Sequence, residues 1–269
     1  MDLHSGLPYW IIRNSLWDYF HPLEKDLSTD VVIVGSGITG ALMAHELCHA
    51  GIKCCIVDKR SIATGSSAAS TALLQYEIDV PLCRMAKIIG EENAATAYHA
   101  CLQSISDIKR VLEETGVNAG FEQLPSLFYA SSAADNKLLE QEHEIRQKHK
   151  LPVNLLEKKK IREEYKVKTP GNALINEASA QMDAYRAATG LLAYHIKESG
   201  LKVFTHTSIK ECIETSDGWI MTTDRGHKIK CGYVIIATGF EAGQFLPQKI
   251  MDLTSTYALV SHPVASEHL

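Results

Sequence analysis

The stretch VVIVGSGITG, residues 31–40, decides the fold of this chain. Its first four residues are consecutive branched apolar residues, which is typical of a strand buried on both faces of a parallel sheet. Three glycines, Gly35, Gly37 and Gly40, then form a G-x-G-x-x-G, and a helix is predicted over 39–50. A second strand is predicted over 53–57, so the segment predicts a βαβ unit.

The glycine motif follows a buried strand and opens a helix, which is the context that a dinucleotide-binding fingerprint requires. Gly35 permits a tight turn, Gly37 lets the backbone approach a pyrophosphate, and Gly40 lets the helix pack on the sheet. Asp58 ends the second strand 18 residues after Gly40, near the place of the acid that binds ribose hydroxyls. Its charge disfavours the 2′-phosphate of NADP, so the motif leaves NAD and FAD open.

Composition and charge argue against several classes of protein. The chain has 269 residues, of which 45% are hydrophobic and 22% charged, as in an ordinary globular protein. A net charge of −5 and the lack of a basic stripe argue against a nucleic-acid partner. No apolar run reaches the roughly 18 residues of a membrane helix, and no signal-like start is present. The 7 cysteines lack metal-ligand spacing, so neither a metal site nor a disulfide framework is predicted. We therefore expect a soluble, cytoplasmic protein that binds no membrane.

The rest of the chain alternates between helical and extended patterns. Residues 1–27 are rich in aromatic residues and are expected to form an arm on the body of the protein. The composition of segment 62–74, mostly Ser, Ala, Thr and Gly, would allow a flexible linker. Helical patterns cover 81–114, 134–150, the mixed-charge run near 158–164, and 183–199 between Asp183 and Gly200. Closely spaced strands are predicted over 202–207, 209–215, 218–223, 227–231 and 233–237.

Two further segments carry a resemblance to a known family. ATGSSAASTALL, residues 63–74, follows the βαβ unit, and VIIATG, residues 234–239, follows the strand meander. In this order, with the glycine fingerprint and the strand at Ile209, they resemble the FAD-dependent oxidoreductases of the D-amino-acid oxidase, glycine oxidase and sarcosine oxidase family. The N-terminal arm and Tyr76-Glu77 resemble gamma-glutamylputrescine oxidase-like members. The resemblance covers roughly residues 28–80 and 172–264.

The resemblance implies an α/β fold with two interleaved domains. One is a Rossmann-like FAD-binding domain with a parallel sheet and a β-meander, expected from residues 28–80 and 183–250. The other is an α+β substrate domain, expected from residues 81–182 and 251–269.

The resemblance also assigns cofactor roles along the chain, with FAD as the cofactor. The glycine loop would cradle the pyrophosphate, Asp58 and Lys59 would lie at the adenosine ribose, and two serines would donate to the phosphates. Small residues after them would run beside the isoalloxazine, and the main chain of Ile209 would meet the adenine. The residues so assigned are Gly35, Gly37, Ile38, Thr39, Gly40, Asp58, Lys59, Ser66, Ser67, Thr71, Ala72, Leu73, Ile209, Ala237, Thr238 and Gly239.

In this family the flavin takes a hydride from the carbon next to an amine. The expected function is therefore oxidation of the C–N bond of an amine or amino acid, a small-molecule substrate. Two alternatives stay open: a non-catalytic FAD-binding protein and, less favoured by the second half of the chain, an NAD-dependent dehydrogenase. No catalytic residue is assigned. The polar candidates for substrate contacts are Tyr76, Arg84, Tyr129, Arg186 and Tyr257, and His262 is considered as a base, although a structural or surface role is the simpler interpretation of each.

Members of this family continue well beyond the equivalent of Val264. Here a strand predicted over 257–264 would enter the substrate domain just before the sequence stops at Leu269. We therefore expect a chain that is truncated relative to the family, with an incomplete substrate domain, an exposed sheet edge and an incomplete FAD site.

Overall fold

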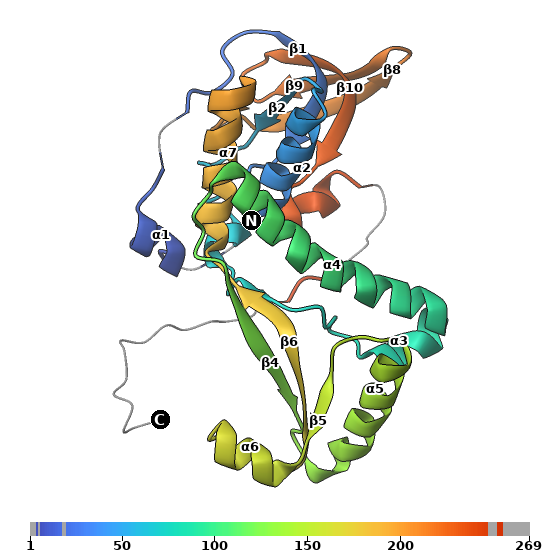
Figure 1. Cartoon of the computed structure of the whole chain (residues 1–269). Coiled ribbons are helices and arrows are strands. Elements are labelled where there is room, and N and C mark those ends of the chain that lie inside the picture. Colours follow the sequence, from blue (N-terminus) through green and yellow to red (C-terminus); the bar gives the residue numbers. More distant parts are fainter. Residues whose placement is uncertain (1–3, 5, 18–19, 247–251, 255–269) are drawn as a thin grey trace. The chain divides into compact units, whose positions relative to one another are not determined.

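The structure, a computed structural model, describes residues 4, 6–17, 20–246 and 252–254. These residues divide into two compact units, each with its own sheet (Figure 1). Unit 1 takes the residues up to Thr71, Leu112–Ala119 and the residues from Asp183 onward, and unit 2 takes Ala72–Val111 and Gly120–Met182. Among the residues described, no helix is long and apolar enough to cross a membrane.

Unit 1 contains a six-stranded sheet in the order β7-β2-β1-β10-β9-β8. Its first four strands are parallel: β7 (Lys202–Phe204), β2 (Cys54–Val57), β1 (Leu27–Val34) and β10 (Lys228–Ile236). The antiparallel strands β9 (Gly218–Thr223) and β8 (Ile209–Thr215) complete the sheet as a meander. The predicted α/β fold with a parallel sheet and a β-meander is confirmed.

Two helices of unit 1, α2 (Ile38–His49) and α7 (Ala184–Ser199), lie side by side (Figure 1). Helix α2 also contacts β1 and β2, and its fully buried residues Ala41 and Ala44 are small enough for close packing. As predicted, Asp183 caps α7 by accepting a hydrogen bond from the Arg186 amide, and the helix ends at Gly200 in a left-handed conformation.

The N-terminal arm contains a short helix, α1 (Tyr9–Asn14), that its sequence did not predict. It is tied to the rest of unit 1 by the Trp10 indole, which donates to the Ser70 carbonyl at 2.7 Å, and by Asn14, which donates to the Asp183 carboxylate at 2.6 Å. The segment 62–74 is not a flexible linker. It contains a 3₁₀ helix, η1 (Ser66–Ala69), in which Ser67 and Ala68 are buried.

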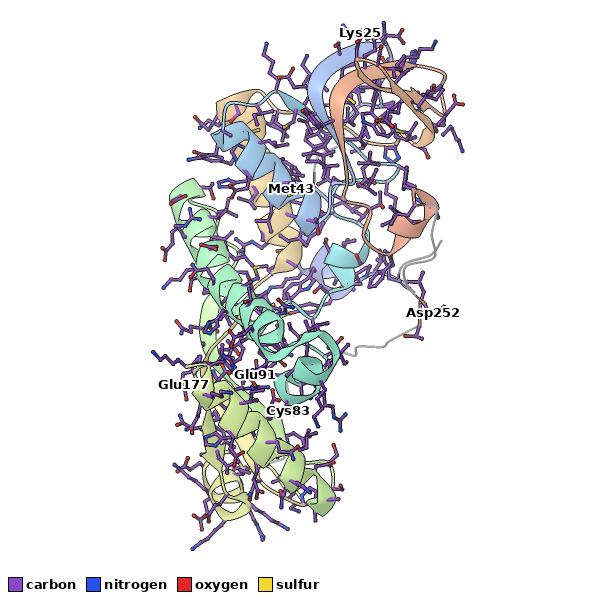
Figure 2. All side chains as sticks on the ribbon, turned by 90° about the vertical axis from the view of Figure 1, so that its right-hand side faces the viewer. Lys25, Met43, Cys83, Glu91, Glu177 and Asp252 are labelled. Atoms are coloured by element: carbon purple, nitrogen blue, oxygen red, sulfur yellow. The ribbon has the colours of Figure 1, made fainter. Side chains whose placement is uncertain are left out.

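Unit 2 contains an antiparallel sheet whose centre is β6 (Ala173–Gln181). β6 pairs with β4 (Glu122–Tyr129) along one edge, and with β3 (Leu73–Leu74) and β5 (Asn154–Leu156). Figure 2 labels Cys83 and Glu91 near the starts of its first two helices. The helical elements are α3 (Leu82–Ile89), α4 (Glu91–Thr115), whose last residues belong to unit 1, η2 (Ala133–Asp135), α5 (Asn136–Lys148) and α6 (Lys158–Glu164).

The observed elements differ from the predicted ones at several places. The helical pattern over 81–114 forms two helices, because Gly90 between them adopts a φ of 86° that interrupts the helix. The strands predicted over 227–231 and 233–237 are one continuous strand, β10. Residues 72–80 belong to unit 2, because β3 pairs with β6, whereas the predicted division placed them with the FAD-binding residues. The strand predicted over 257–264 lies outside the described residues.

Candidate functional site

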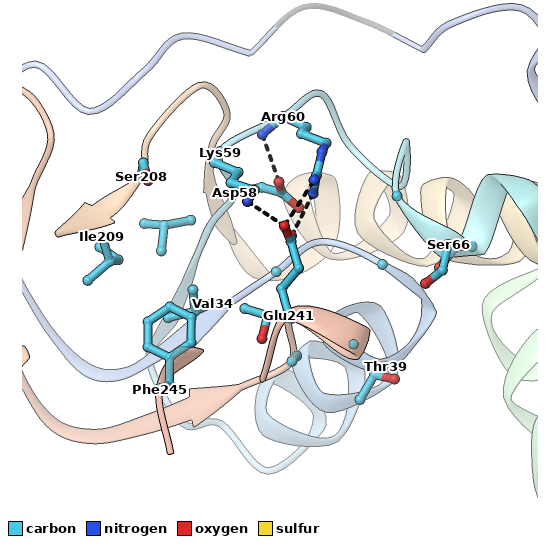
Figure 3. A pocket seen from close by; sticks show the side chains of 18 of the residues that line it. Val34, Thr39, Asp58, Lys59, Arg60, Ser66, Ser208, Ile209, Glu241 and Phe245 are labelled. Atoms are coloured by element: carbon cyan, nitrogen blue, oxygen red, sulfur yellow. Dashed lines mark hydrogen bonds and ion pairs between the residues drawn. The ribbon is translucent and has the colours of Figure 1, made fainter. Parts of the chain in front are cut away.

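A cavity of about 140 Å³ lies at the carboxyl ends of β1, β2 and β10 in unit 1 (Figure 3). This volume is roughly ten times what one buried water needs, so the cavity is large enough to hold part of a ligand. Open α/β sheets bind ligands outside the carboxyl ends of their parallel strands. The cavity brings together most of the predicted cofactor residues: Gly35, Gly37, Ile38, Thr39, Asp58, Lys59, Ser66, Ser67, Ile209, Ala237, Thr238 and Gly239.

Each of the three glycines of the fingerprint occupies a position where an added Cβ would meet a different neighbouring atom. Gly35 has a φ of 111°, and a Cβ there would collide with the Ala237 carbonyl oxygen. A Cβ at Gly37 would lie 2.9 Å from Ser67 Oγ. Gly40 does not line the cavity, but a Cβ there would overlap the Gly35 carbonyl oxygen. Backbone atoms therefore exclude a side chain at Gly35 and Gly40, whereas at Gly37 a side chain would meet only the Ser67 hydroxyl.

The start of α2 is held by η1. Ser67 Oγ accepts a hydrogen bond from the Ile38 amide at 2.9 Å. Because the hydroxyl accepts there, its own proton remains available for an acceptor such as a phosphate oxygen. The first N–H groups of the helix have no intrahelical carbonyl partners, and the macrodipole favours negative charge at this end. This end of the cavity therefore suits an anion.

Asp58 fixes the turn after β2. Its Oδ2 accepts hydrogen bonds from the Ser36 amide at 2.8 Å and the Ser36 hydroxyl at 2.6 Å, and its Oδ1 accepts from the Arg60 amide at 2.8 Å. A carboxylate has roughly four acceptor sites, so the remaining capacity can serve ribose hydroxyls. The predicted ribose contact of Asp58 stays a prediction.

The cavity is also bordered by an ion-pair cluster that sequence reasoning missed. Glu241, in η3 (Gly239–Gln244), contacts Lys59 Nζ through Oε1 at 2.6 Å and Arg60 Nη1 through Oε2 at 2.9 Å (Figure 3). Burial would raise the pKa of Glu241, but the hydrogen bonds and charges of Arg60 and Lys59 outweigh it and lower the pKa to about 2. Arg60 and Glu241 are 181 positions apart, so no local sequence pattern could predict their ion pair. They meet because β10, which precedes η3, lies next to β1 in the sheet.

We expect Glu241→Gln to reduce stability in a way that depends on pH. The pKa of this carboxyl falls from 4.5 in its ordinary state to about 2 in the fold, so ionisation stabilises the fold above about pH 4.5. That contribution is about 2 kcal/mol after allowance for the partly exposed cations, and it is lost as the pH falls toward 2. Denaturant titrations at several pH values should show the gap between wild type and variant closing over this range. A gap that stays constant would contradict the assignment.

The structure does not bring every predicted residue to the cavity. Thr71, Ala72 and Leu73 do not line it, and their predicted place beside the isoalloxazine stays a prediction. Of the polar substrate candidates, Tyr76 is buried and donates to the Pro152 carbonyl at 2.7 Å, whereas Arg84, Tyr129 and Arg186 are exposed, which agrees with structural or surface roles. Tyr257 and His262 lie outside the described residues. The lining residues that were not predicted include Arg60, Thr207, Ser208, Gln244 and Phe245.

One further observation tests whether the cavity fits a dinucleotide. Within the described part of the chain, Thr238 Oγ1 is buried without a hydrogen-bond partner, and Thr238 lines the cavity. A buried hydroxyl in this state calls for a ligand or an ordered water. Together with the glycine loop and the open start of α2, it fits a phosphate-bearing cofactor.

The sequence matches the family described as FAD dependent oxidoreductase over residues 30–269. The chain belongs to this family. Its members use FAD, so the dinucleotide that the cavity fits is FAD rather than NAD, and the NAD-dependent alternative is set aside.

Comparison with other proteins matches this member of the family to parts of longer chains. It is 23% identical over 232 residues to a Bacillus subtilis (strain 168) protein named as a Rieske 2Fe-2S iron-sulfur protein, covering 86% of this chain and 44% of that protein. It superimposes on L-proline dehydrogenase from P. horikoshii with a TM-score of 0.67 and 22% identity, covering 84% of this chain and 58% of that protein. It superimposes on glycine oxidase from Geobacillus kaustophilus with a TM-score of 0.68 and 22% identity, covering 81% of this chain and 57% of that protein. The chain thus spans about half the length of these proteins.

Proposed function

We propose that this chain forms the FAD-binding part of an oxidoreductase that oxidises the C–N bond of an amine or amino acid. The observation that carries the proposal is the cavity at the carboxyl ends of the parallel strands. There a glycine loop, the start of α2 and an unpartnered buried hydroxyl converge. Bound FAD supplies a two-electron acceptor that takes a hydride from the carbon next to the amine.

The residues of this chain bind and orient the cofactor rather than react with the substrate. Gly37, Thr39 and the start of α2 hold the pyrophosphate, and Ser67 and Thr238 donate hydroxyl protons to it. Asp58 accepts from the ribose, while the Glu241 ion pairs keep Lys59 and Arg60 in place beside it. The other assigned positions are Gly35, Ile38, Gly40, Ser66, Thr71, Ala72, Leu73, Ile209, Ala237 and Gly239.

The proposed substrate class rests on the proteins whose structures resemble this chain. L-proline dehydrogenase and glycine oxidase, which share its fold, carry amino-acid substrates in their names. The cavity residues include no nucleophile paired with a base, as expected where the cofactor does the difficult step. A small amine or amino acid is therefore the proposed substrate, and a non-catalytic FAD-binding protein is the alternative.

Two measurements test the proposal on the purified chain. The absorption spectrum after incubation with FAD is expected to show bound flavin after desalting, and a colourless protein would overturn the cofactor assignment. Under anaerobic conditions, a panel of amines and amino acids is then expected to bleach the flavin band, whereas the matching 2-hydroxy acids leave it unchanged. Bound flavin that no amine reduces would favour the non-catalytic alternative.

A further inference from the structure

Unit 1 contains a second chemically reactive feature, at the end of α2 away from the cavity. Cys48, in the last turn of α2, and Cys54, the first residue of β2, have their sulfur atoms 3.9 Å apart. Both side chains are partly exposed. Cys48 lies ten residues after Ile38, or about 15 Å along the helix, so this pair is separate from the cofactor site.

We propose that Cys48 and Cys54 form an oxidisable dithiol, a modification site that peroxide converts into an intramolecular disulfide. The turn between them is fixed by backbone hydrogen bonds, from the Gly51 amide to the Cys48 carbonyl at 3.0 Å and from the Ile52 amide to the Leu47 carbonyl at 2.9 Å. A disulfide needs sulfur atoms about 2.05 Å apart, so the Cys48 and Cys54 sulfurs, now 3.9 Å apart, must approach each other by roughly 2 Å when the bond forms.

Hydrogen bonds make Cys48 the nucleophile of the pair. The hydrogen bond from Cys54 lowers the pKa of Cys48 to about 7, against the opposing effect of burial, and the Ser199 hydroxyl adds to the lowering. The same hydrogen bond and burial raise the pKa of Cys54, which therefore keeps its proton. A thiol whose pKa is near the ambient pH combines a large thiolate fraction with retained nucleophilicity.

Two buried histidines, His45 and His195, and the exposed Ser199 form a chain of polar groups that leads to this thiolate. His45 Nδ1 lies 2.9 Å from His195 Nε2, and His195 Nδ1 lies 3.1 Å from Ser199 Oγ. Burial, together with the charges of His45 and His49, lowers the pKa of His195, which keeps its ring neutral. With the Nδ1 proton on both rings, each donor in the chain points toward the next acceptor and the Ser199 hydroxyl donates to Cys48. The network thus favours the ionised form of this sulfur.

The chemistry balances with hydrogen peroxide as oxidant. The Cys48 thiolate attacks one peroxide oxygen, the O–O bond breaks, and the leaving hydroxide takes a proton to form water. Cys54 then attacks the resulting sulfenic acid at sulfur, the S–O bond breaks, and a second water forms with the Cys54 proton. The two sulfurs lose two electrons and one molecule of peroxide is reduced. A thiol reductant reverses the step.

Neighbouring features favour a dithiol over other uses of these cysteines. In the described part of the chain, no group of three or more His, Cys, Asp or Glu side chains could hold a metal ion. The adjacent Cys55 is 1% exposed, and burial raises its pKa to about 12, so it stays inert. Cys212, partly exposed on β8, has a pKa raised by burial and provides a comparison within the same unit.

The first experiment measures iodoacetamide alkylation of each cysteine by peptide mass spectrometry across pH. Cys48 is expected to react about 5- to 10-fold faster than Cys212 at pH 7, because its larger thiolate fraction outweighs its lower intrinsic nucleophilicity. Its profile should have a midpoint near pH 7 that moves upward in Cys54→Ala and, by less, in Ser199→Ala. A Ser199→Thr variant keeps the hydroxyl, so its Cys48 profile should have the same midpoint as that of wild type. A Cys48 profile that coincides with that of Cys212 would overturn the proposal.

The second experiment treats the full chain with hydrogen peroxide and maps the products. The expected product is one Cys48–Cys54 disulfide, seen as the loss of two hydrogens and reversed by dithiothreitol. Cys54→Ala should instead give a Cys48 sulfenic acid that dimedone traps, and Cys48→Ser should give neither product. Cys212→Ser should behave as wild type. Disulfides that involve other cysteines equally, or no disulfide at peroxide concentrations that oxidise Cys48, would refute the pairing.

Discussion

Replacing Arg146 by methionine is expected to lower the stability of unit 2 by about 3–5 kcal/mol, because it leaves buried carboxylates without their counter-charge. Arg146 is 1% exposed, and Glu142 is fully buried. Arg146 Nε donates to Glu142 Oε1 at 2.7 Å, and its Nη1 donates to Glu77 Oε1 at 3.0 Å. Methionine fills much of the space but supplies no positive charge and no donor.

The carboxylates cannot leave this site, because the fold of unit 2 uses them. Glu142 accepts from the amides of Leu82 and Cys83 at 2.9 and 2.8 Å, so it caps the start of α3. Glu77 also accepts from the Asn176 amide group at 2.6 Å, and its Oε2 is buried without a hydrogen-bond partner within the described chain. The guanidinium further lies 5.5 Å from the centre of the Tyr76 ring. Removing the one cation therefore leaves two anions in a poorly solvated place.

Tryptophan fluorescence would follow the unfolding of unit 1, because all three tryptophans, at positions 10, 17 and 219, belong to it. The effect of Arg146→Met needs a measurement that follows unit 2. Hydrogen exchange of the α3 and α5 amides under native conditions gives the local opening free energy. The matched control is Arg110→Met on α4, an exposed arginine with an ion pair to Asp107 at 3.5 Å, which should cost no more than about 1 kcal/mol. Equal protection in the two variants would contradict the buried-network assignment.

The cluster of Arg146, Glu142 and Glu77 could not be predicted from the sequence, because the sequence does not show which charged residues are buried. The charged pattern over 134–150 correctly predicts a helix, observed as α5, but charge alone suggests a solvated surface. Glu142 and Arg146 are at i and i+4, a spacing that exposed and buried pairs share. Their partners Glu77 and Asn176 come from distant parts of the chain, so only the tertiary fold places them together.

The cavity at the start of α2 shows the opposite case, because its requirements are local. The strand, the glycines and the start of α2 lie within residues 31–40, where backbone sterics decide which residue types fit. Ser67 and Thr238 could be predicted only through the order of family segments. Glu241 could not be predicted, because its contact with Lys59 and Arg60 spans most of the chain.

Replacing Gly37 by valine is expected to weaken FAD binding by about 10- to 100-fold while the chain stays folded. Gly37 has an extended backbone with a φ of −71°, so a side chain there causes no left-handed strain. Its Cβ would lie 2.9 Å from Ser67 Oγ, and the branched methyls would occupy the space proposed for the pyrophosphate at the start of α2. Loss of one charge-assisted hydrogen bond costs about 1.5–3 kcal/mol, which corresponds to that range of affinity.

The matched control is Gly243→Ala in η3, next to the same cavity. Gly243 has no atom within 4 Å of an added Cβ and no positive φ, so this variant should bind FAD as wild type does. Flavin fluorescence titration gives the affinity, and circular dichroism checks the fold. If Gly37→Val bound FAD unchanged, the pyrophosphate could not lie over Gly37. If it unfolded, Gly37→Ala, whose single methyl meets only the movable Ser67 hydroxyl, would separate a loss of binding from a loss of structure.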